Sequence, residues 1–114
     1  MKYMLLIYGN HAAWDAMTEQ SQQELIQVHV SLQAELTASG ELLDVNELPL
    51  QDAKIVRTSG GVPVVTDGPF AESKEILAGY YLVDCASVER AAEIAGRLVE
   101  AEFAPIEVRQ VSGG

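Results

Sequence analysis

Two segments of this sequence are apolar on both faces of an extended strand, and they constrain the fold more than any other feature. In residues 2–8, tyrosine, leucine and isoleucine alternate with methionine, leucine and tyrosine, so that both faces of the strand are apolar. The run over residues 76–83 has the same property. Such strands need cover on both sides, which predicts two central strands of one sheet.

A long helix is predicted from about Thr18 or Ser21 to Ser39. The four residues that begin at Ser21 have the spacing of a capping box, and Gly40 stands where a left-handed residue would end the helix. One apolar stripe runs along this helix and consists of Leu25, Val28, Leu32 and Leu36. His29 falls inside that stripe.

The other elements follow from alternation and from turn residues: a loop over 10–17, a strand over 41–48, a hairpin with arms 53–58 and 62–66, a helix from Ser87 through about Glu100, and a strand over 105–111. The order gives two strand–helix–strand halves in one antiparallel sheet, with the hairpin as an insert. This is the ferredoxin-like arrangement of the α+β class. Residues 1–114 are predicted to form a single domain.

Two helices can cover only one side of such a sheet. The apolar side chains on the other side of the central strands would form a large exposed patch. A second copy of the chain is the simplest cover, and two sheets packed back to back form a dimeric α+β barrel. We therefore expect a homodimer.

Charge and cysteine content exclude several classes of partner. The chain has 7 basic and 17 acidic residues and a formal net charge of −10, which disfavours nucleic acid and anionic membranes. Its single cysteine forms no internal disulfide, which is compatible with the cytoplasm. The apolar run near the N-terminus is too short for a signal-peptide core or a membrane span. We expect a cytoplasmic protein.

A rigid turn presents an acidic side chain just before the second central strand. In Asp67-Gly68-Pro69-Phe70, Gly68 has wide backbone freedom, Pro69 fixes its own φ, and Phe70 can anchor the corner in a core. The turn therefore aims Asp67 at one place.

Four stretches carry a family resemblance: residues 1–9, 66–74, 79–81 and 107–109. By these stretches the chain resembles the YCII-related family and, through its Asp-Gly-Pro-Phe motif, the DGPF subfamily. Residues 108–111 read Val-Arg-Gln-Val where the subfamily usually has Val-Arg-Pro-Val. The resemblance implies the dimeric α+β barrel already suggested by the strands.

The resemblance also implies an active-site pair of a helix histidine and an aspartate, which map onto His29 and Asp67. A carboxylate that orients an imidazole can support acid/base catalysis near neutral pH. We expect the two side chains to be in contact or joined by one water. The alternative is a core histidine bonded to a backbone carbonyl and an aspartate that caps its own turn.

Five further residues are candidates for contact with a ligand: His11, Trp14, Arg57, Phe70 and Tyr80. His11 and Trp14 belong to the predicted loop after the first central strand, where sheet proteins often bind ligands. Arg57 can pair with an anionic group, and Tyr80 points to one face of its strand. Each also has a structural alternative, as a surface residue, an ion pair or core packing.

No metal or cofactor is expected. The two histidines have no ligand spacing, no glycine-rich phosphate loop leads into a helix, and Cys85 has no electropositive neighbour in sequence. The leading interpretation is a homodimer that binds a small organic metabolite and performs cofactor-free acid/base chemistry. The alternative is a noncatalytic regulatory module with a protein partner, because the resemblance implies genes beside extracytoplasmic-function sigma factors.

Overall fold

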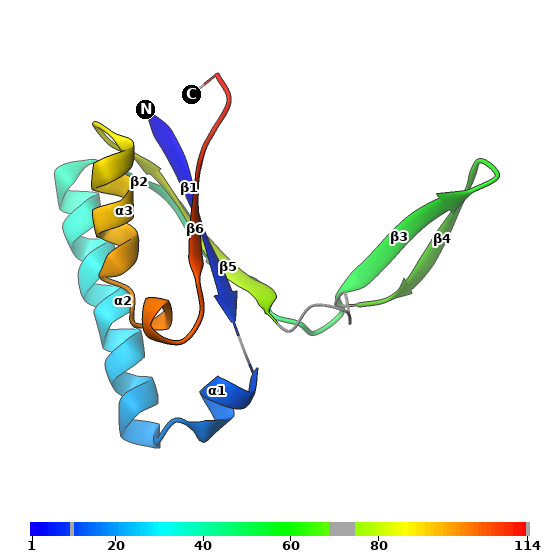
Figure 1. Ribbon diagram of the computed structural model, residues 1–114, viewed down its shortest axis with the longest axis horizontal. Coiled ribbons are helices and arrows are strands. Elements are labelled where there is room, and N and C mark those ends of the chain that lie inside the picture. Colours follow the sequence, from blue (N-terminus) through cyan, green and yellow to red (C-terminus); the bar gives the residue numbers. More distant parts are fainter. Residues whose placement is uncertain (10, 69–74, 114) are drawn as a thin grey trace.

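A four-stranded antiparallel sheet forms the centre of the molecule (Figure 1). The computed structural model describes residues 1–9, 11–68 and 75–113, except for the side chain of His11. The strands lie side by side in the order β2 (Leu42–Glu47), β5 (Ile76–Asp84), β1 (Lys2–Gly9) and β6 (Ile106–Gln110). The two strands predicted to be central, β1 and β5, are the inner pair. The chain has the ferredoxin-like α+β fold.

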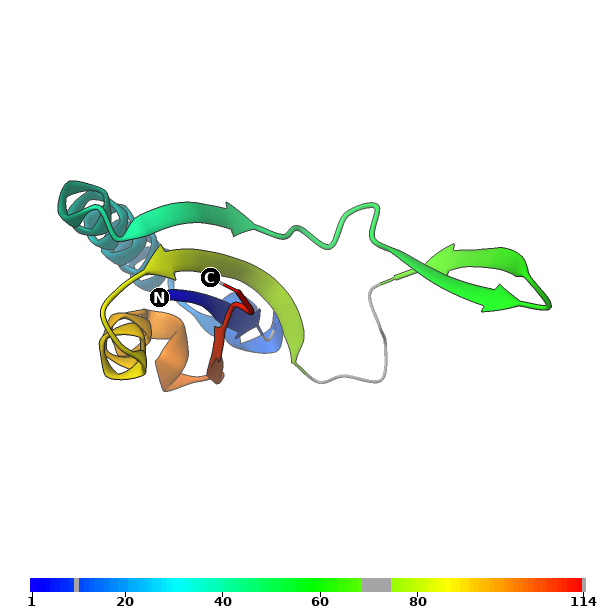
Figure 2. The same cartoon turned by 90° about the horizontal axis from the view of Figure 1, so that it is seen from above.

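Both longer helices cover the same face of the sheet (Figure 2). From α2 (Glu19–Ser39), Leu32 is fully buried, and from α3 (Val88–Gly96), Ile94 is fully buried. Both belong to one core cluster with Leu5 of β1. No helix in the described part of the chain has the length and apolar character needed to cross a lipid bilayer.

The opposite face of the sheet is apolar at its centre and is covered by none of the described helices. Met4 and Leu6 of β1 and Leu82 of β5 lie on this open face and remain partly exposed. Tyr80 lies on the same face, and its hydroxyl donates to the Asp44 carboxylate at 2.7 Å. The two-sided apolar character expected from the sequence is present.

The ends of α2 follow local chemistry. The Thr18 hydroxyl oxygen accepts the Ser21 backbone N–H at 3.0 Å, so α2 begins at the first of the two predicted starts. The capping box that would begin at Ser21 is not used. Gly40 has φ 81° and its N–H donates to the carbonyls of Leu36 and Thr37, as predicted for a left-handed helix stop.

The predicted loop over residues 10–17 is partly wrong, because α1 (His11–Ala16) is a short helix. The backbone N–H of Met17 donates to the Trp14 carbonyl at 3.1 Å and ends this helix. Most of its described side chains are exposed. A helix with so little buried surface needs no apolar stripe, so periodicity could not reveal it.

The second predicted helix ends early. Ser87 caps α3 as expected, because its hydroxyl oxygen accepts the Arg90 N–H at 3.2 Å. The helix ends at Gly96, not near Glu100, and Leu98 leaves helical geometry with ψ 134° while its side chain is buried. A 3₁₀ turn, η1 (Val99–Glu102), follows. The early break therefore moves Glu100 off the axis of α3.

An ion pair joins the start of β2 to α3. Glu41 accepts two hydrogen bonds from the Arg90 guanidinium, from Nε at 2.9 Å and from Nη2 at 2.8 Å. These bonds lower the pKa of Glu41 to about 2. The pair is mostly shielded, with 17% of the Glu41 side chain and 28% of the Arg90 side chain exposed. It ties the edge strand to the helix layer.

The predicted hairpin is confirmed, and it projects on the side of the sheet away from the helices (Figures 1 and 2). Strands β3 (Lys54–Ser59) and β4 (Val62–Asp67) join through Gly60 and Gly61, which have φ 58° and 80°. All residues of β4 are exposed. The projection gives a radius of gyration of 16.0 Å, against about 13 Å for a compact domain of this length.

Candidate functional site

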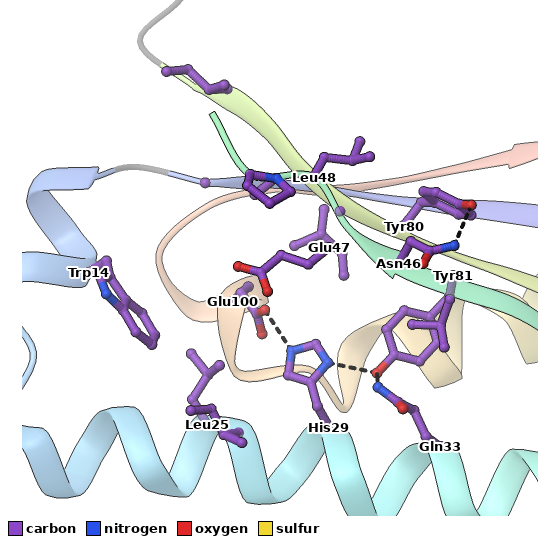
Figure 3. A pocket seen from close by; sticks show the side chains of 18 of the residues that line it. Trp14, Leu25, His29, Gln33, Asn46, Glu47, Leu48, Tyr80, Tyr81 and Glu100 are labelled. Atoms are coloured by element: carbon purple, nitrogen blue, oxygen red, sulfur yellow. Dashed lines mark hydrogen bonds and ion pairs between the residues drawn. The ribbon is translucent and has the colours of Figure 1, made fainter. Parts of the chain in front are cut away.

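A cavity of about 650 Å³ opens between α2 and the sheet (Figure 3). Its volume lies in the range of small-molecule sites in proteins. Much of its wall is apolar and comes from several elements, with Ile7, Leu25, Val45, Leu48, Ile76 and Phe103 among the residues. An organic molecule with an apolar body would fit such a wall.

A polar cluster centred on His29 interrupts this apolar wall. The helical stripe of α2 carries His29 toward the sheet, where Nδ1 lies 2.6 Å from the Tyr81 hydroxyl and Nε2 lies 2.7 Å from Glu100 Oε2 (Figure 3). Gln33, one helical turn after His29, donates from Nε2 to the same Tyr81 oxygen at 3.2 Å. The cluster thus joins α2, β5 and η1 inside the cavity.

The hydrogen-bond chain has a definite direction when the imidazole is neutral. Burial raises the pKa of Tyr81, so the phenol keeps its proton at neutral pH. Because a carboxylate can only accept, a neutral His29 has its hydrogen on Nε2, so its Nδ1 accepts the phenol proton of Tyr81. The ring then carries its own hydrogen on Nε2 and donates it to Glu100. Every donor in the chain points toward the carboxylate.

Glu100 has one oxygen left over. Oε2 is bonded to His29, while Oε1 is buried and has no hydrogen-bond partner among the described residues. The side chain is 15% exposed and lines the cavity. A buried polar atom without a partner is costly and uncommon in proteins. Oε1 is therefore a buried acceptor of the cluster whose hydrogen-bonding capacity is unused among the described residues.

The expected contact between His29 and Asp67 is not made within the chain. Asp67 closes β4, its side chain is 86% exposed, and Oδ1 accepts a hydrogen bond from Lys54 Nζ at 2.6 Å. The reason is hairpin register: Asp67 lies opposite Lys54, and the next amide, of Gly68, donates to the Ala53 carbonyl at 2.8 Å. The backbone-carbonyl alternative for His29 is also wrong, because both of its partners are side chains. A chemical role for Asp67 stays a prediction.

Of the other candidate residues from the sequence, some line the cavity and others do not. Trp14 of α1 and Tyr80 of β5 line the cavity, although the Tyr80 hydroxyl bonds on the open face of the sheet. Arg57 lies exposed on β3 of the hairpin and is not among the described residues that line the cavity. His11 begins α1, but its side chain is outside the described atoms, and Phe70 lies outside the described residues.

Sequence reasoning missed Gln33 and Glu100. Gln33 carried a usable signal, because it follows His29 by four positions and so shares its helix face. Glu100 carried none, since 71 residues separate it from His29 and its position depends on the break after α3. Within the described residues, no group of three or more His, Cys, Asp or Glu side chains is arranged to hold a metal ion.

The fold and the cluster together define a class: small α+β proteins of ferredoxin-like topology with a polar, histidine-centred cavity under the first long helix. The sequence matches the YCII-related domain over residues 1–112, and the chain belongs to the YCII-related family. It is 35% identical over 102 residues to an uncharacterised protein of Rhizobium meliloti (strain 1021), a match that covers 89% of this chain and 82% of that protein. The expected family is confirmed, and the DGPF subfamily stays a prediction.

Proposed function

We propose that the chain binds a small organic molecule in the cavity beneath α2 and that Glu100, held in place by His29, transfers protons to and from it without a cofactor. One observation carries the proposal: a largely buried His29–Glu100 pair in the wall of a mostly apolar cavity leaves Glu100 Oε1 without a hydrogen bond. Active sites commonly combine a concave apolar pocket with a few converging polar groups.

The chemistry follows from the direction of the hydrogen bonds. Glu100 Oε1 accepts a proton from an acidic C–H, N–H or O–H group of the ligand, while His29 holds Oε2 in place. Tyr81 and Gln33 fix the orientation of the imidazole from its other nitrogen. Returning the proton to a different atom of the ligand gives an isomerisation, and delivering it to a leaving group gives a cleavage.

A metabolite library screened by thermal shift tests binding first. Hits are expected to stabilise the wild type and to lose that effect in His29→Ala. Gln27→Ala is the matched control, because Gln27 lies on the exposed face of the same helix. A library that stabilises wild type and His29→Ala equally would place binding elsewhere and contradict the proposal.

Proton transfer is tested on the hits in D₂O. NMR is expected to show deuterium replacing C–H hydrogens of the ligand in the presence of wild type and much more slowly with His29→Ala. Hits that bind without exchange would favour the noncatalytic regulatory module, which stays the second candidate. The link to a sigma-factor pathway is an expectation from the resemblance and has no support in the described contacts.

We also propose that the chain works as a homodimer. Two features support this: the open face of the sheet has an apolar centre, and the hairpin projects on that same side with exposed Val56, Val64 and Val65. A two-stranded hairpin alone is marginally stable in water. A second copy would cover the open face and give the hairpin a surface to pack on.

Light scattering measures the dimer directly. Wild type is expected at twice the chain mass, and Val65→Lys is expected to weaken the association. Val88→Lys provides the control, since Val88 is also an exposed valine but lies on α3, on the helix side of the sheet. A monomeric wild type at micromolar concentration would end this part of the proposal.

A further inference from the structure

Carboxylates outnumber basic side chains among the described residues that line the cavity. Glu100 and Glu47 both line it, and His29 is already bonded to Glu100 (Figure 3). Among the described residues that line the cavity there is no lysine or arginine. The chain as a whole has a formal net charge of −10, so the wider field does not offset the two carboxylates.

The unused hydrogen-bonding capacity of the cluster is that of an acceptor. With a neutral imidazole, one Gln33 N–H donates to Tyr81, Tyr81 donates to His29 and His29 donates to Glu100, so this chain of bonds ends in an acceptor. The unbonded atom, Glu100 Oε1, can only accept while the carboxylate is ionised. A ligand that completes the cluster must therefore bring a donor.

We infer that the cavity selects neutral or positively charged molecules that carry an N–H or O–H donor on an apolar body, and that it rejects carboxylates. A ligand carboxylate near Glu100 would face like charge in a poorly solvated site, and it has no donor for Oε1. An ammonium or hydroxyl group at the same place would satisfy that atom. The inference rests on the proposed function, since it names the ligand class of the same cavity.

Three ligands with one apolar body test this selectivity: 2-phenylethylamine, 2-phenylethanol and 3-phenylpropionate. Each is titrated into ¹⁵N-labelled protein at neutral pH and physiological salt, and amide shifts of cavity residues such as His29 and Gly79 report the site and the affinity. The amine is expected to bind at least about tenfold more tightly than the carboxylate, a difference that a single close charge can supply. The alcohol is expected between them.

Variants distinguish a binding preference set by the cavity from one set by the overall charge of the chain. Glu100→Gln is expected to bring the amine-to-carboxylate ratio close to one, because the amide oxygen accepts from His29 and the neutral NH₂ group replaces Oε1. Binding of the alcohol is expected to change little, since a hydroxyl group can accept from NH₂ as well as donate. Glu102→Gln removes one charge from the same 3₁₀ turn at an exposed residue outside the cavity wall, and its ratio is expected to match wild type. Glu47→Gln is expected to lower the ratio by a smaller factor, so the test survives if Glu100→Gln does not fold.

The outcomes are distinct. A carboxylate that binds as tightly as the amine, with shifts at the same amides, would overturn the selectivity and leave small-molecule binding intact. Equal ratios in Glu100→Gln and Glu102→Gln would attribute the preference to overall charge and would also overturn the inference. If none of the three ligands shifts the cavity amides at millimolar concentration, the proposed function fails together with it.

Discussion

The cavity and the hairpin hold their polar side chains in opposite ways. In the cavity, His29 is fixed by two side chains from two other elements, and its Tyr81 partner is 1% exposed. On the hairpin, Asp67 has one cross-strand partner, Lys54, and both side chains face solvent. A motif that predicts a rigid turn does not by itself make a site. What makes one here is the convergence of distant elements on a buried position.

The largest expected effect contrasts a core residue with a hairpin residue. Leu32→Ala removes a fully buried side chain and is expected to lower the free energy of unfolding by about 2–5 kcal/mol. Val65→Ala, on the exposed β4, is expected to cost less than about 0.5 kcal/mol in the monomer. Urea denaturation at low protein concentration measures both. Equal losses would break the contrast and show that the hairpin is buried in an assembly.

The next effect concerns the Glu41–Arg90 pair that ties β2 to α3. Glu41→Gln is expected to cost about 2 kcal/mol, because charge-assisted bonds of a mostly shielded pair are lost. The pKa of Glu41 is lowered from 4.5 to about 2 on folding. This contribution is therefore fully present above pH 4.5 and is lost as the pH falls toward 2.

Denaturation between pH 6 and pH 2 checks that window. The difference in stability between wild type and Glu41→Gln should shrink over the acidic end of the range. Glu93→Gln is the matched control, because Glu93 binds the same Arg90 but is 67% exposed. A gap between wild type and Glu41→Gln that stays constant down to pH 2 would mean that the pair does not set the pKa of Glu41.

A smaller effect on stability and on the ring shifts of His29 tests which carboxylate bonds this histidine. Glu100→Gln is expected to change the ¹⁵N shifts of the His29 ring and to cost about 1 kcal/mol of stability, since one bond loses its charge. Asp67→Asn is expected to leave those ring shifts unchanged, because the Asp67 side chain bonds Lys54. A shift caused by Asp67→Asn would restore the pairing expected from the family, supplied from a partner copy.

The smallest effect lies on the hairpin itself. Lys54→Ala removes an ion pair whose side chains are 52% and 86% exposed, and exposed pairs contribute less than about 1 kcal/mol. Thermal unfolding of this variant should nearly match wild type, and added salt should remove any difference. A large loss that persists in high salt would show that Lys54 is enclosed in the assembled protein.

The sequence was sufficient where short-range signals determine structure. Alternation located β1 and β5, and Gly40 and Ser87 marked helix ends by their own backbone chemistry. It failed for α1, which has little buried surface and so shows no apolar period. The inward position of His29 could also be predicted, because helical spacing places it in the apolar stripe of α2.

The hydrogen-bond partners of His29, by contrast, could not be predicted from short-range signals. Glu100 reaches the cavity only because α3 stops at Gly96 and Leu98 turns inward, which no local pattern encodes. The Asp-Gly-Pro-Phe motif favours Asp67 instead, because its residue types are typical of a rigid turn. Contacts between residues that lie many tens of positions apart in the sequence depend on how the whole chain packs.

The tip of the hairpin offers a practical handle. Ser59, beside the two turn glycines Gly60 and Gly61, is exposed, so it can carry a bulky reporter. Cys85 is the chain's single cysteine and is buried, so a thiol introduced by Ser59→Cys would react with a spin label or fluorophore far faster. If two copies pair as proposed, distances between two such labels would report their orientation, and the labels would stand outside the cavity beneath α2.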